Sequence, residues 1–539
     1  MTRARPFVLF FAFCLGPDAC GPWPVRAQHA GHRLAPIPLE ILERPVTLRT
    51  GIGRVHHETP TASKDAQAFF DQGLSYLHSY VWIEAARSFN QALRADPNLA
   101  LAHVGLSLAL VELNRAADAR RALDTARAMA PRLPDHDRRH VETRALQMLA
   151  EDAPSDARRL AAYRTALDAA IAAFPADVEF VLLRGMAESS DAADRGQGSV
   201  ASSAPYYERA LGLSPGNVAA HHYLAHTHEN GGDLPDARAH SAAFATQAPG
   251  VPHARHMHGH SLRRVGRVHE AIAEFEAADR RHREYAAQER IPAEYDWHFE
   301  HNLRLLATSL QYTGQVKRAE TLLKTAFALP TNLLVQAYNK REWPMFLRAR
   351  GRHAEAEAAA RLLIANPNPV AQATGHIEAG FAMLGMKRWG DAATESNTAL
   401  RLLRAAPGGA IAGHALQALQ GEFNLRTAER TKGRASLEEV ARKMRAAPGP
   451  DPWSQALFQL EAIARAARDV GDWEFAGRMA RQMMEHDPLY AGSHYALALV
   501  AEHDGDAATA KAEFALARKY WAKADPDLPE LAEVRRKIK

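Results

Sequence analysis

The chain has 539 residues, of which 66 are basic, 62 are acidic and 47% are hydrophobic. The formal net charge of only +4 excludes the one-sided basic composition of a nucleic-acid-binding protein. The length is sufficient for several domains or for one long array of repeats. Both cysteines, Cys14 and Cys20, lie near the start, so a metal bound by the rest of the chain needs histidine, carboxylate or carbonyl ligands.

The first predicted element is a signal peptide over residues 1–27. Two arginines precede an apolar run that has the length of a signal-peptide core and is too short to span a bilayer. Val25 and Ala27 supply the small residues expected just before a cleavage site. Lipid attachment at Cys20 is a less favoured alternative, because Pro17 stands where a lipoprotein signal usually has leucine. No later stretch is apolar enough to span a membrane, so we expect a periplasmic or secreted protein without an integral membrane segment.

Residues 28–64 are predicted to form an extended segment, and a repeated helical pattern follows from residue 65. One set of small, aromatic and proline residues recurs after 34 residues. The first copy consists of Phe69, Gly73, Tyr76, Ala85, Phe89, Ala92 and Pro97, and the second of His103, Ser107, Leu110, Ala119, Leu123, Ala126 and Pro131. Small residues let two helices approach closely, aromatic residues fill the space between them, and glycine or proline ends each helix. The pattern therefore predicts one helical hairpin repeated along the chain.

This pattern resembles the tetratricopeptide repeat (TPR). The resemblance implies an all-α fold, a right-handed superhelical solenoid of about ten TPR hairpins over residues 65–523, with the polar residues 524–539 as a C-terminal cap. Residues 196–203 are expected to form a flexible insertion within one hairpin. Solenoids of this kind usually serve as interaction surfaces, so we expect a peptide, protein or small-molecule ligand in the concave groove. The fold alone does not assign a function.

Histidine is concentrated in one part of the chain. Of 27 histidines, 13 lie between His221 and His301, including the stretches HHYLAHTHE at 221–229 and HARHMHGH at 253–260. In the TPR family the first helix of each hairpin lines the groove, chiefly through its second, fifth, ninth and twelfth places. The residues that the resemblance places there are His222, His226, Glu229, His253, His256, His260 and His301. Steps of three, four and seven residues also return to one helix face.

The groove-facing residues predict a transition-metal site. Neighbouring first helices pack about 8–10 Å apart, so side chains from three of them can converge. Imidazole suits copper, zinc and iron, and does not identify the metal. The predicted ligands are His222, His226, Glu229, His253, His256, His260 and His301. Glu229 is also the candidate catalytic residue, as a general base beside the metal.

The remaining histidines are predicted to have other surroundings. In the repeat frame, three of them face the second helix of their hairpin: His221, His228 and His258. Three others are predicted to lie on the surface: His240, His269 and His282. His56 and His57 are expected in a loop before the first hairpin. His78 faces the groove, but four repeats away, and it reaches the other histidines only if the superhelix curls.

A second resemblance supports the ligands rather than an activity. HYLAHTHE at 222–229, HARHMHGH at 253–260 and His301-Asn302 resemble a group of uncharacterised exported bacterial TPR proteins with histidines at these spacings. The stretches 72–74 and 77–80 share the resemblance. The group often has another histidine where this chain has Arg304.

Two functions are therefore expected. One is an exported TPR metalloprotein, which is an enzyme if the metal supports oxidative or hydrolytic chemistry. The alternative is a non-enzymatic periplasmic scaffold that binds a peptide or partner protein in the groove. In the scaffold, contacts with carboxylate or phosphate groups would come from Arg255, Arg263, Arg264 and Arg304. Neither function involves nucleic acid.

Overall fold

The computed structural model describes residues 37–330, 334–406, 409–447 and 450–538. The predicted signal peptide, with Cys14 and Cys20, lies outside the described residues. Within the described ranges the chain is helical, and the only β-type pairing is an isolated bridge between Arg54 and Asn217. In the same ranges, no helix has both the length and the apolar character needed to cross a bilayer.

Most helices follow one another with short connections; the longer ones precede α2 and α9. The N-terminal helices are α1 (Leu39–Leu42), α2 (Lys64–His78), α3 (Trp82–Ala95), α4 (Ala100–Glu112), α5 (Ala116–Met129), α6 (Asp135–Asp152), α7 (Ala157–Ala173), α8 (Val178–Met186) and α9 (Ala204–Leu213). The central helices are α10 (Val218–Gly231), α11 (Leu234–Gln247), α12 (Pro252–Arg264), α13 (Val268–Glu289), α14 (Trp297–Tyr312) and α15 (Val316–Ala328). The C-terminal helices are α16 (Leu334–Asn339), α17 (Glu342–Ala349), α18 (His353–Ile364), α19 (Pro369–Gly385), α20 (Trp389–Ala405), α21 (Gly413–Arg426), α22 (Arg430–Ala446), α23 (Pro450–Asp469), α24 (Trp473–His486), α25 (Ala491–His503), α26 (Ala507–Tyr520) and α27 (Pro529–Lys537).

Successive helices pack as hairpins, from α2 with α3 to α25 with α26. The repeat residues explain the close packing within them. The ring of Phe89 lies between two glycines, because a Cβ atom on Gly73 or Gly105 would come within 2.5 or 2.4 Å of it. A Cβ atom on Gly259 would likewise come within 2.7 Å of Phe275. The all-α solenoid predicted from the repeats is confirmed.

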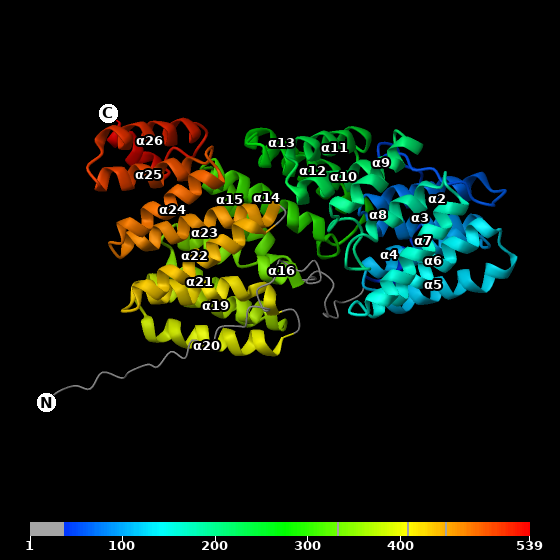
Figure 1. Cartoon of the computed structure of the whole chain (residues 1–539), viewed down its shortest axis with the longest axis horizontal. Helices are drawn as coiled ribbons and strands as arrows, with labels where there is room; N and C mark the ends of the chain where they lie inside the picture. Colours follow the sequence, from blue (N-terminus) through cyan, green and yellow to red (C-terminus); the bar gives the residue numbers. More distant parts are fainter. Residues whose placement is uncertain (1–36, 331–333, 407–408, 448–449, 539) are drawn as a thin grey trace.

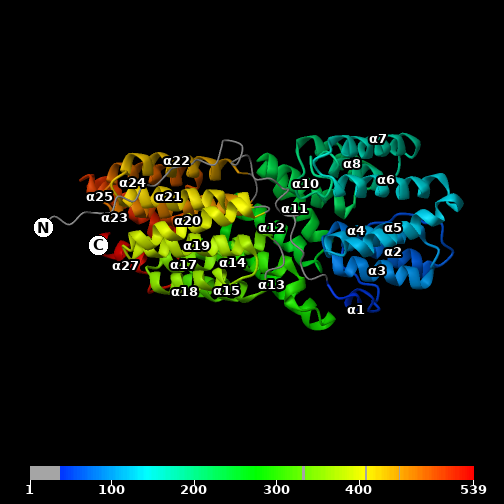
Figure 2. The ribbon, with the colours of Figure 1, turned by 90° about the horizontal axis from the view of Figure 1, so that it is seen from below.

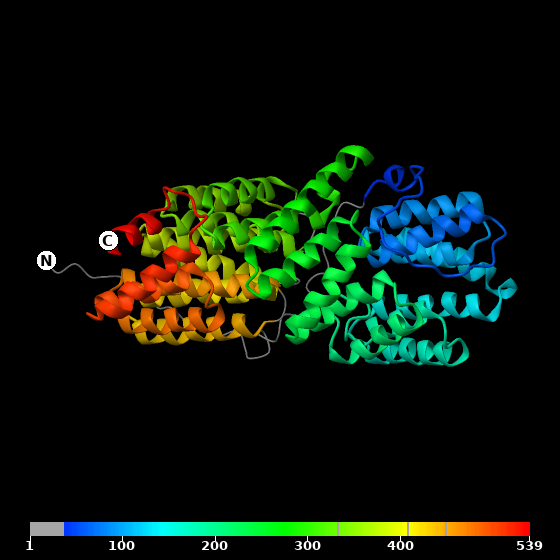
Figure 3. The same cartoon turned by 90° about the horizontal axis from the view of Figure 1, so that it is seen from above.

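The chain is elongated, and its centre carries the histidine-rich helices. In Figure 1, α2–α8 lie at the right and α19–α26 at the left, with α10–α14 between them. Figures 2 and 3 keep the two ends apart in the perpendicular views. The central helix α10 also packs against α2, which is far from it in the sequence. The solenoid therefore curls enough to bring distant hairpins together.

The segment expected to be a flexible insertion is instead held by specific hydrogen bonds. The Asp194 carboxylate accepts hydrogen bonds from the backbone of Gly196 and Gly198 at 2.8 and 3.1 Å. Asn230 Nδ2 donates to the carbonyl oxygens of Gln197 and Ser199 at 2.9 and 3.0 Å. The segment lies between α8 and α9, within one hairpin as predicted, and its partners are supplied by α10 and by a residue just before the segment.

Candidate metal centre

Three imidazoles from two neighbouring first helices converge on one point. His222 and His226 lie one turn apart on α10, and His253 stands at the start of α12. His222 Nε2 lies 3.0 Å from His253 Nε2 and 3.1 Å from His226 Nε2. Nitrogen ligands of a tetrahedral metal, at about 2.0–2.1 Å from it, are about 3.3 Å apart. The separations are therefore close to those of ligands that share one metal.

A second group of three imidazoles lies beside the first. It consists of His256 and His260 on α12 and His301 on α14, whose ligand atoms all lie within 4.8 Å of one another. The ring centroid of His256 is 4.3 Å from that of His260 and 4.8 Å from that of His301. The structure thus brings together all six predicted histidines, and it divides them into two triads. We call His222, His226 and His253 the first triad and the other three the second triad.

Hydrogen bonds to protein oxygens orient one histidine in each triad. His222 Nδ1 donates to the backbone carbonyl of His78 at 2.6 Å. His256 Nδ1 donates to Asn302 Oδ1 at 3.0 Å, and the Asn302 amide is itself fixed by donating to the Phe275 carbonyl at 2.9 Å. Because Nδ1 carries the proton in both rings, each Nε2 keeps a free lone pair that can bind a metal. Within the described residues, His256 Nε2 is buried without a hydrogen-bond partner.

We expect Asn302→Leu to weaken metal binding at the second triad by roughly 10–100-fold, the usual cost of removing the hydrogen-bond partner of a histidine ligand. The affinity is measured by competition with a chelator of known strength. Ser309→Ala on the same helix is the matched control, because the Ser309 hydroxyl is buried and donates only to its own helix at Leu305. Equal affinities for the Asn302→Leu variant and the parent would contradict the assigned role of Asn302.

Two carboxylates stand next to the second triad. Glu229 Oε2 lies 3.6 Å from His260 Nδ1, and in the described part of the chain its Oε1 is buried without a hydrogen-bond partner. Asp451 Oδ2, at the start of α23, lies 3.6 Å from His301 Nδ1. Glu229 was predicted from the groove pattern, whereas Asp451 was not, because it lies 150 residues after His301 in the sequence. Either carboxylate is placed to orient a histidine of the second triad or to be a further ligand if a metal binds there.

The aromatic side chain of Tyr80 covers the first triad. The ring centroid of Tyr80 lies 4.4, 6.0 and 5.2 Å from those of His222, His226 and His253. Tyr80 has a φ of 59°, the left-handed conformation that Gly266 and Gly314 adopt at the equivalent turn of later hairpins. Its hydroxyl donates to the carbonyl of Arg195 at 2.8 Å. The turn between α2 and α3 thus closes the first triad, and His222 is 0% exposed.

Sequence reasoning missed His298, a further histidine of the site. Its ring centroid is 4.4 Å from that of His253, and among the described residues its Nε2 has no hydrogen-bond partner. His298 stacks on Trp297 with the ring centroids 3.9 Å apart. It precedes His301 by three residues, a spacing that puts both on one helix face and could have revealed it.

Burial keeps the imidazoles in the neutral, metal-binding form. It lowers the pKa of His222 to about 3 and that of His301 to about 4. Burial, with neighbouring imidazoles, also lowers the pKa of His226, His253 and His256. These five rings are therefore neutral at pH 7, as metal ligands must be.

The histidines outside the triads have varied surroundings. Three turn towards the second helix of their hairpin, as expected: His221 Nδ1 lies 3.0 Å from His240 Nδ1, His228 stacks on His240, and His258 lies 3.6 Å from Glu274. The prediction that His282 lies on the surface was wrong. It is buried and its Nδ1 lies 2.6 Å from Asp296 Oδ2, because α13 extends past the repeat length and packs against the start of α14.

A small pocket adjoins the first triad. Its volume is about 90 Å³, and His253 and His298 form part of its wall. The aromatic residues that line the rest include Tyr76, Tyr80, Trp82, Tyr285, Tyr295 and Trp297. An apolar ligand group can therefore lie beside the imidazoles of the first triad.

Comparison with known proteins agrees with the repeat pattern. The family model of the tetratricopeptide repeat matches residues 82–134 and 193–252. The second stretch contains α10, with two of the three histidines of the first triad. None of the curated proteins matches this sequence significantly.

Three solved structures illustrate the similarity in fold. The Cut9–Hcn1 hetero-tetramer of the APC/C is 13% identical, with 89% of this chain and 79% of that chain covered and a TM-score of 0.34. The apo form of the quorum sensor NprR from B. thuringiensis is 13% identical, with coverages of 72% and 98% and a TM-score of 0.42. A tetratricopeptide repeat protein from Parabacteroides merdae ATCC 43184 is 14% identical, with coverages of 48% and 93% and a TM-score of 0.33. The chain therefore contains tetratricopeptide repeats over the matched residues, and its helical hairpins continue on both sides of them.

Proposed function

We propose that this protein is an exported TPR metalloprotein that binds transition metal through the two histidine triads. The observation that carries the proposal is the convergence of three Nε2 atoms at 3.0–3.1 Å in the first triad, with the second triad directly beside it. Purely imidazole ligands suit copper, zinc or iron. Export to the periplasm or beyond follows from the signal peptide expected over residues 1–27.

The surroundings of the triads favour chemistry over a purely structural metal site. Each triad supplies three protein ligands, and catalytic zinc sites commonly have three protein ligands and one open position. The Glu229 carboxylate is close enough to the second triad to accept a proton from a metal-bound water, or to bind the metal. The aromatic pocket beside the first triad can hold an organic substrate. We therefore propose a metal-dependent oxidative or hydrolytic enzyme.

A scaffold function is the second candidate, because the TPR fold suggests a protein partner. The observation that favours it is a cavity of about 440 Å³ in the C-terminal half. Charged residues that line it include Glu342, Arg348, Arg350, Glu422, Arg426, Glu461 and Arg465. The arginines expected from the sequence are less suitable, because Arg255 already bonds Glu274 and Arg304 already bonds Glu342.

Metal analysis tests the proposed function. The full chain is expressed with its leader and without a polyhistidine tag, so that metal is loaded in the exporting cell. After purification, elemental analysis should find about one equivalent of copper, zinc or iron that is lost in His222→Ala/His256→Ala, and about two such equivalents if both triads fill. Metal below about a tenth of an equivalent, before and after incubation with each of the three ions, would contradict the proposal and favour the scaffold.

A further inference from the structure

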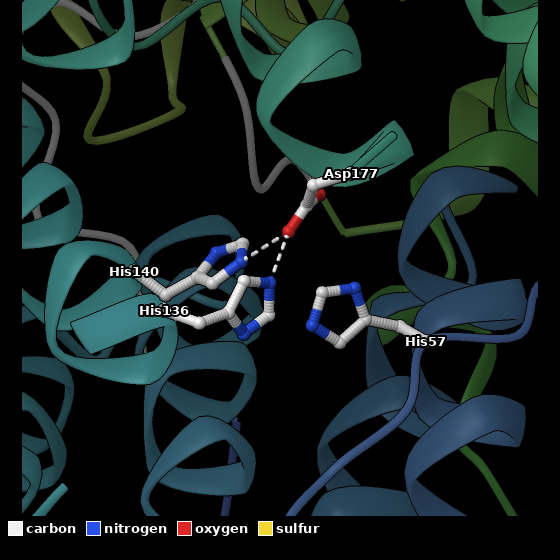
Figure 4. A group of neighbouring side chains, drawn as sticks. All are labelled: His57, His136, His140 and Asp177. Atoms are coloured by element: carbon white, nitrogen blue, oxygen red, sulfur yellow. Dashed lines mark hydrogen bonds and ion pairs between the residues drawn. The ribbon is translucent and has the colours of Figure 1, made fainter. Parts of the chain in front are cut away.

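A second cluster of potential metal ligands lies in the N-terminal half, away from the two triads. Figure 4 shows His57, His136, His140 and Asp177 pointing towards one another. His136 and His140 are one turn apart on α6 and share a face. Asp177 immediately precedes α8, and His57 comes from the segment before α2. Three parts of the chain thus contribute to one cluster.

The donor atoms of the cluster are close enough to share one ion. One ligand atom from each of the four residues lies within 4.8 Å of all the others. Asp177 Oδ2 is 2.6 Å from His136 Nε2 and 2.9 Å from His140 Nε2. Ligands of a tetrahedral zinc ion are about 3.3–3.5 Å apart, so these groups need to separate by less than about 1 Å to bind one.

His57 is held in place by its backbone, and its ring faces the cluster. Its amide donates to Asp71 Oδ1 at 3.2 Å, and its carbonyl accepts from Gln67 Nε2 at 2.9 Å. Its ring centroid is 5.4 Å from that of His136 and 4.9 Å from that of His140. In the part of the chain that the structure describes, His57 Nε2 is buried and has no hydrogen-bond partner. A buried imidazole nitrogen without a partner is costly, and a metal ion would satisfy it.

An ion pair explains only part of this arrangement. The Asp137 and Asp177 carboxylates raise the pKa of His136 to about 9, so His136 and Asp177 form an ion pair without metal. Asp177 Oδ1 also caps α8 by accepting from the backbone of Phe180 at 3.0 Å. Neither role requires His57, whose pKa is lowered by burial and by the neighbouring His140. The ion pair therefore does not explain why the imidazole of His57 lies in the cluster.

From this geometry we infer that His57, His136, His140 and Asp177 form a separate site for a divalent first-row transition metal. Three imidazoles and one carboxylate form a complete set of four protein ligands for zinc. A metal with four protein ligands stabilises the fold rather than activating water. Here it would join the segment before α2 to α6 and to the start of α8.

The proposed site is separate from the triads, but it lies near the residues that orient them. A cavity of about 50 Å³ has both His57 and His140 in its wall, together with Glu179 and His78. Glu179 Oε2 lies 2.9 Å from His78 Nε2, and the carbonyl of His78 accepts the hydrogen bond from His222. A metal that fixes α8 against α2 therefore also stabilises the position of His78 beside the first triad.

Metal titration of a variant without functional triads tests this site. In His222→Ala/His256→Ala, one equivalent of Zn²⁺ should still bind, and Co²⁺ in its place should give the visible absorption of a tetrahedral complex. Adding Asp177→Asn should weaken binding by about 100-fold or more, since a charged ligand is lost while asparagine still caps the helix. His57→Ala should have a similar effect. His56→Ala is the matched control, because the His56 side chain is 66% exposed and pairs with Asp71.

The outcomes separate this site from the triads. If His222→Ala/His256→Ala does not fold, Asp177→Asn and His57→Ala are made singly in the parent chain. Each should lower the zinc content by one equivalent and leave the metal of the triads in place. Circular dichroism identifies any variant that loses its helices, and Asp177→Asn is the one designed to keep them. The inference is overturned if Asp177→Asn has the same zinc content as the chain with Asp177. It is also overturned if His56→Ala and His57→Ala bind Zn²⁺ equally well. A lower melting temperature in Asp177→Asn without any metal difference would indicate an ion pair only, and would also overturn it.

Discussion

His222→Ala and His256→Ala should each remove about one equivalent of the metal bound by the triads, and the double variant should remove both. His222 is the common neighbour of His226 and His253 in the first triad, and His256 contacts both other rings of the second triad. Two imidazoles are too few to hold a metal tightly, so the affinity should fall well beyond the roughly 10–100-fold cost of losing a ligand's hydrogen-bond partner. Elemental analysis and chelator competition measure both effects.

A pair of histidines on α10 provides the control for this prediction. His226 belongs to the first triad, whereas His228, two residues later, turns away and stacks on His240. His226→Ala should lose metal with its helices intact, and His228→Ala should keep its metal and mainly lower the melting temperature. Equal loss of metal in the two variants would show that the assignment of the helix faces is wrong.

Loss of metal from one triad should leave the other filled. The triads have separate ligands, although His253 and His256 lie on the same helix with ring centroids 5.7 Å apart. If His222→Ala alone releases all the metal, the six histidines bind a single shared cluster rather than two ions. Stoichiometry in the single variants therefore decides between these arrangements.

The contents of the two triads could be predicted from the sequence because they depend on local geometry. Spacings of three, four and seven residues fix a helix face, and the repeat fixes which helices are neighbours. His222, His226, His256 and His260 follow from these two rules together with the groove-lining places that the TPR resemblance implies. His298 follows from the same rule, three residues before His301.

The positions of the other residues of the site depend on how far the solenoid curls. A local sequence pattern does not predict this curl. Tyr80 and the carbonyl of His78 reach the first triad from the first hairpin, and Asp451 reaches the second triad from α23. The curl is the sum of small rotations between successive hairpins, so a slight change in each would separate these residues. For the same reason His57 could be placed in a loop, while its approach to His140 could not be foreseen.

A buried ionic network fixes Arg195, whose carbonyl accepts the hydrogen bond from the Tyr80 hydroxyl. Arg195 Nη2 lies 2.6 Å from Glu151 Oε1, and Arg144 Nη1 lies 2.7 Å from the same oxygen. Arg195 Nε also lies 3.0 Å from Glu112. Burial acts to raise the pKa of Glu151, but the two guanidinium groups outweigh it and lower the pKa to about 2. Glu151 is therefore ionised in the folded protein even in moderate acid.

Glu151→Gln should lower the free energy of unfolding at pH 7 by about 3 kcal/mol, because it leaves buried arginines with fewer counter-charges. The folded pKa lies below the unfolded value of 4.5, so the carboxylate stabilises the fold fully above pH 4.5 and progressively less as the pH falls towards 2. The difference between parent and variant, measured by urea unfolding, should thus shrink to about half or less at pH 3. A difference that does not change between pH 7 and pH 3 would contradict the argument.

Glu439→Gln is the control for Glu151→Gln, because Glu439 is paired with arginine as Glu151 is but is partly exposed to solvent. Comparing the two variants also tests whether the buried network stabilises the metal centre. Hydrogen bonding with Arg442 also lowers the pKa of Glu439 to about 2, but the Glu439 side chain is 37% exposed. Exposed pairs usually contribute less than about 1 kcal/mol, so this variant should unfold nearly as the parent does. Because the carbonyl of Arg195 accepts the hydrogen bond from Tyr80, only Glu151→Gln should also loosen the cover of the first triad. Its metal should therefore exchange with a chelator faster than in the parent, whereas the metal of Glu439→Gln should exchange at the parent's rate.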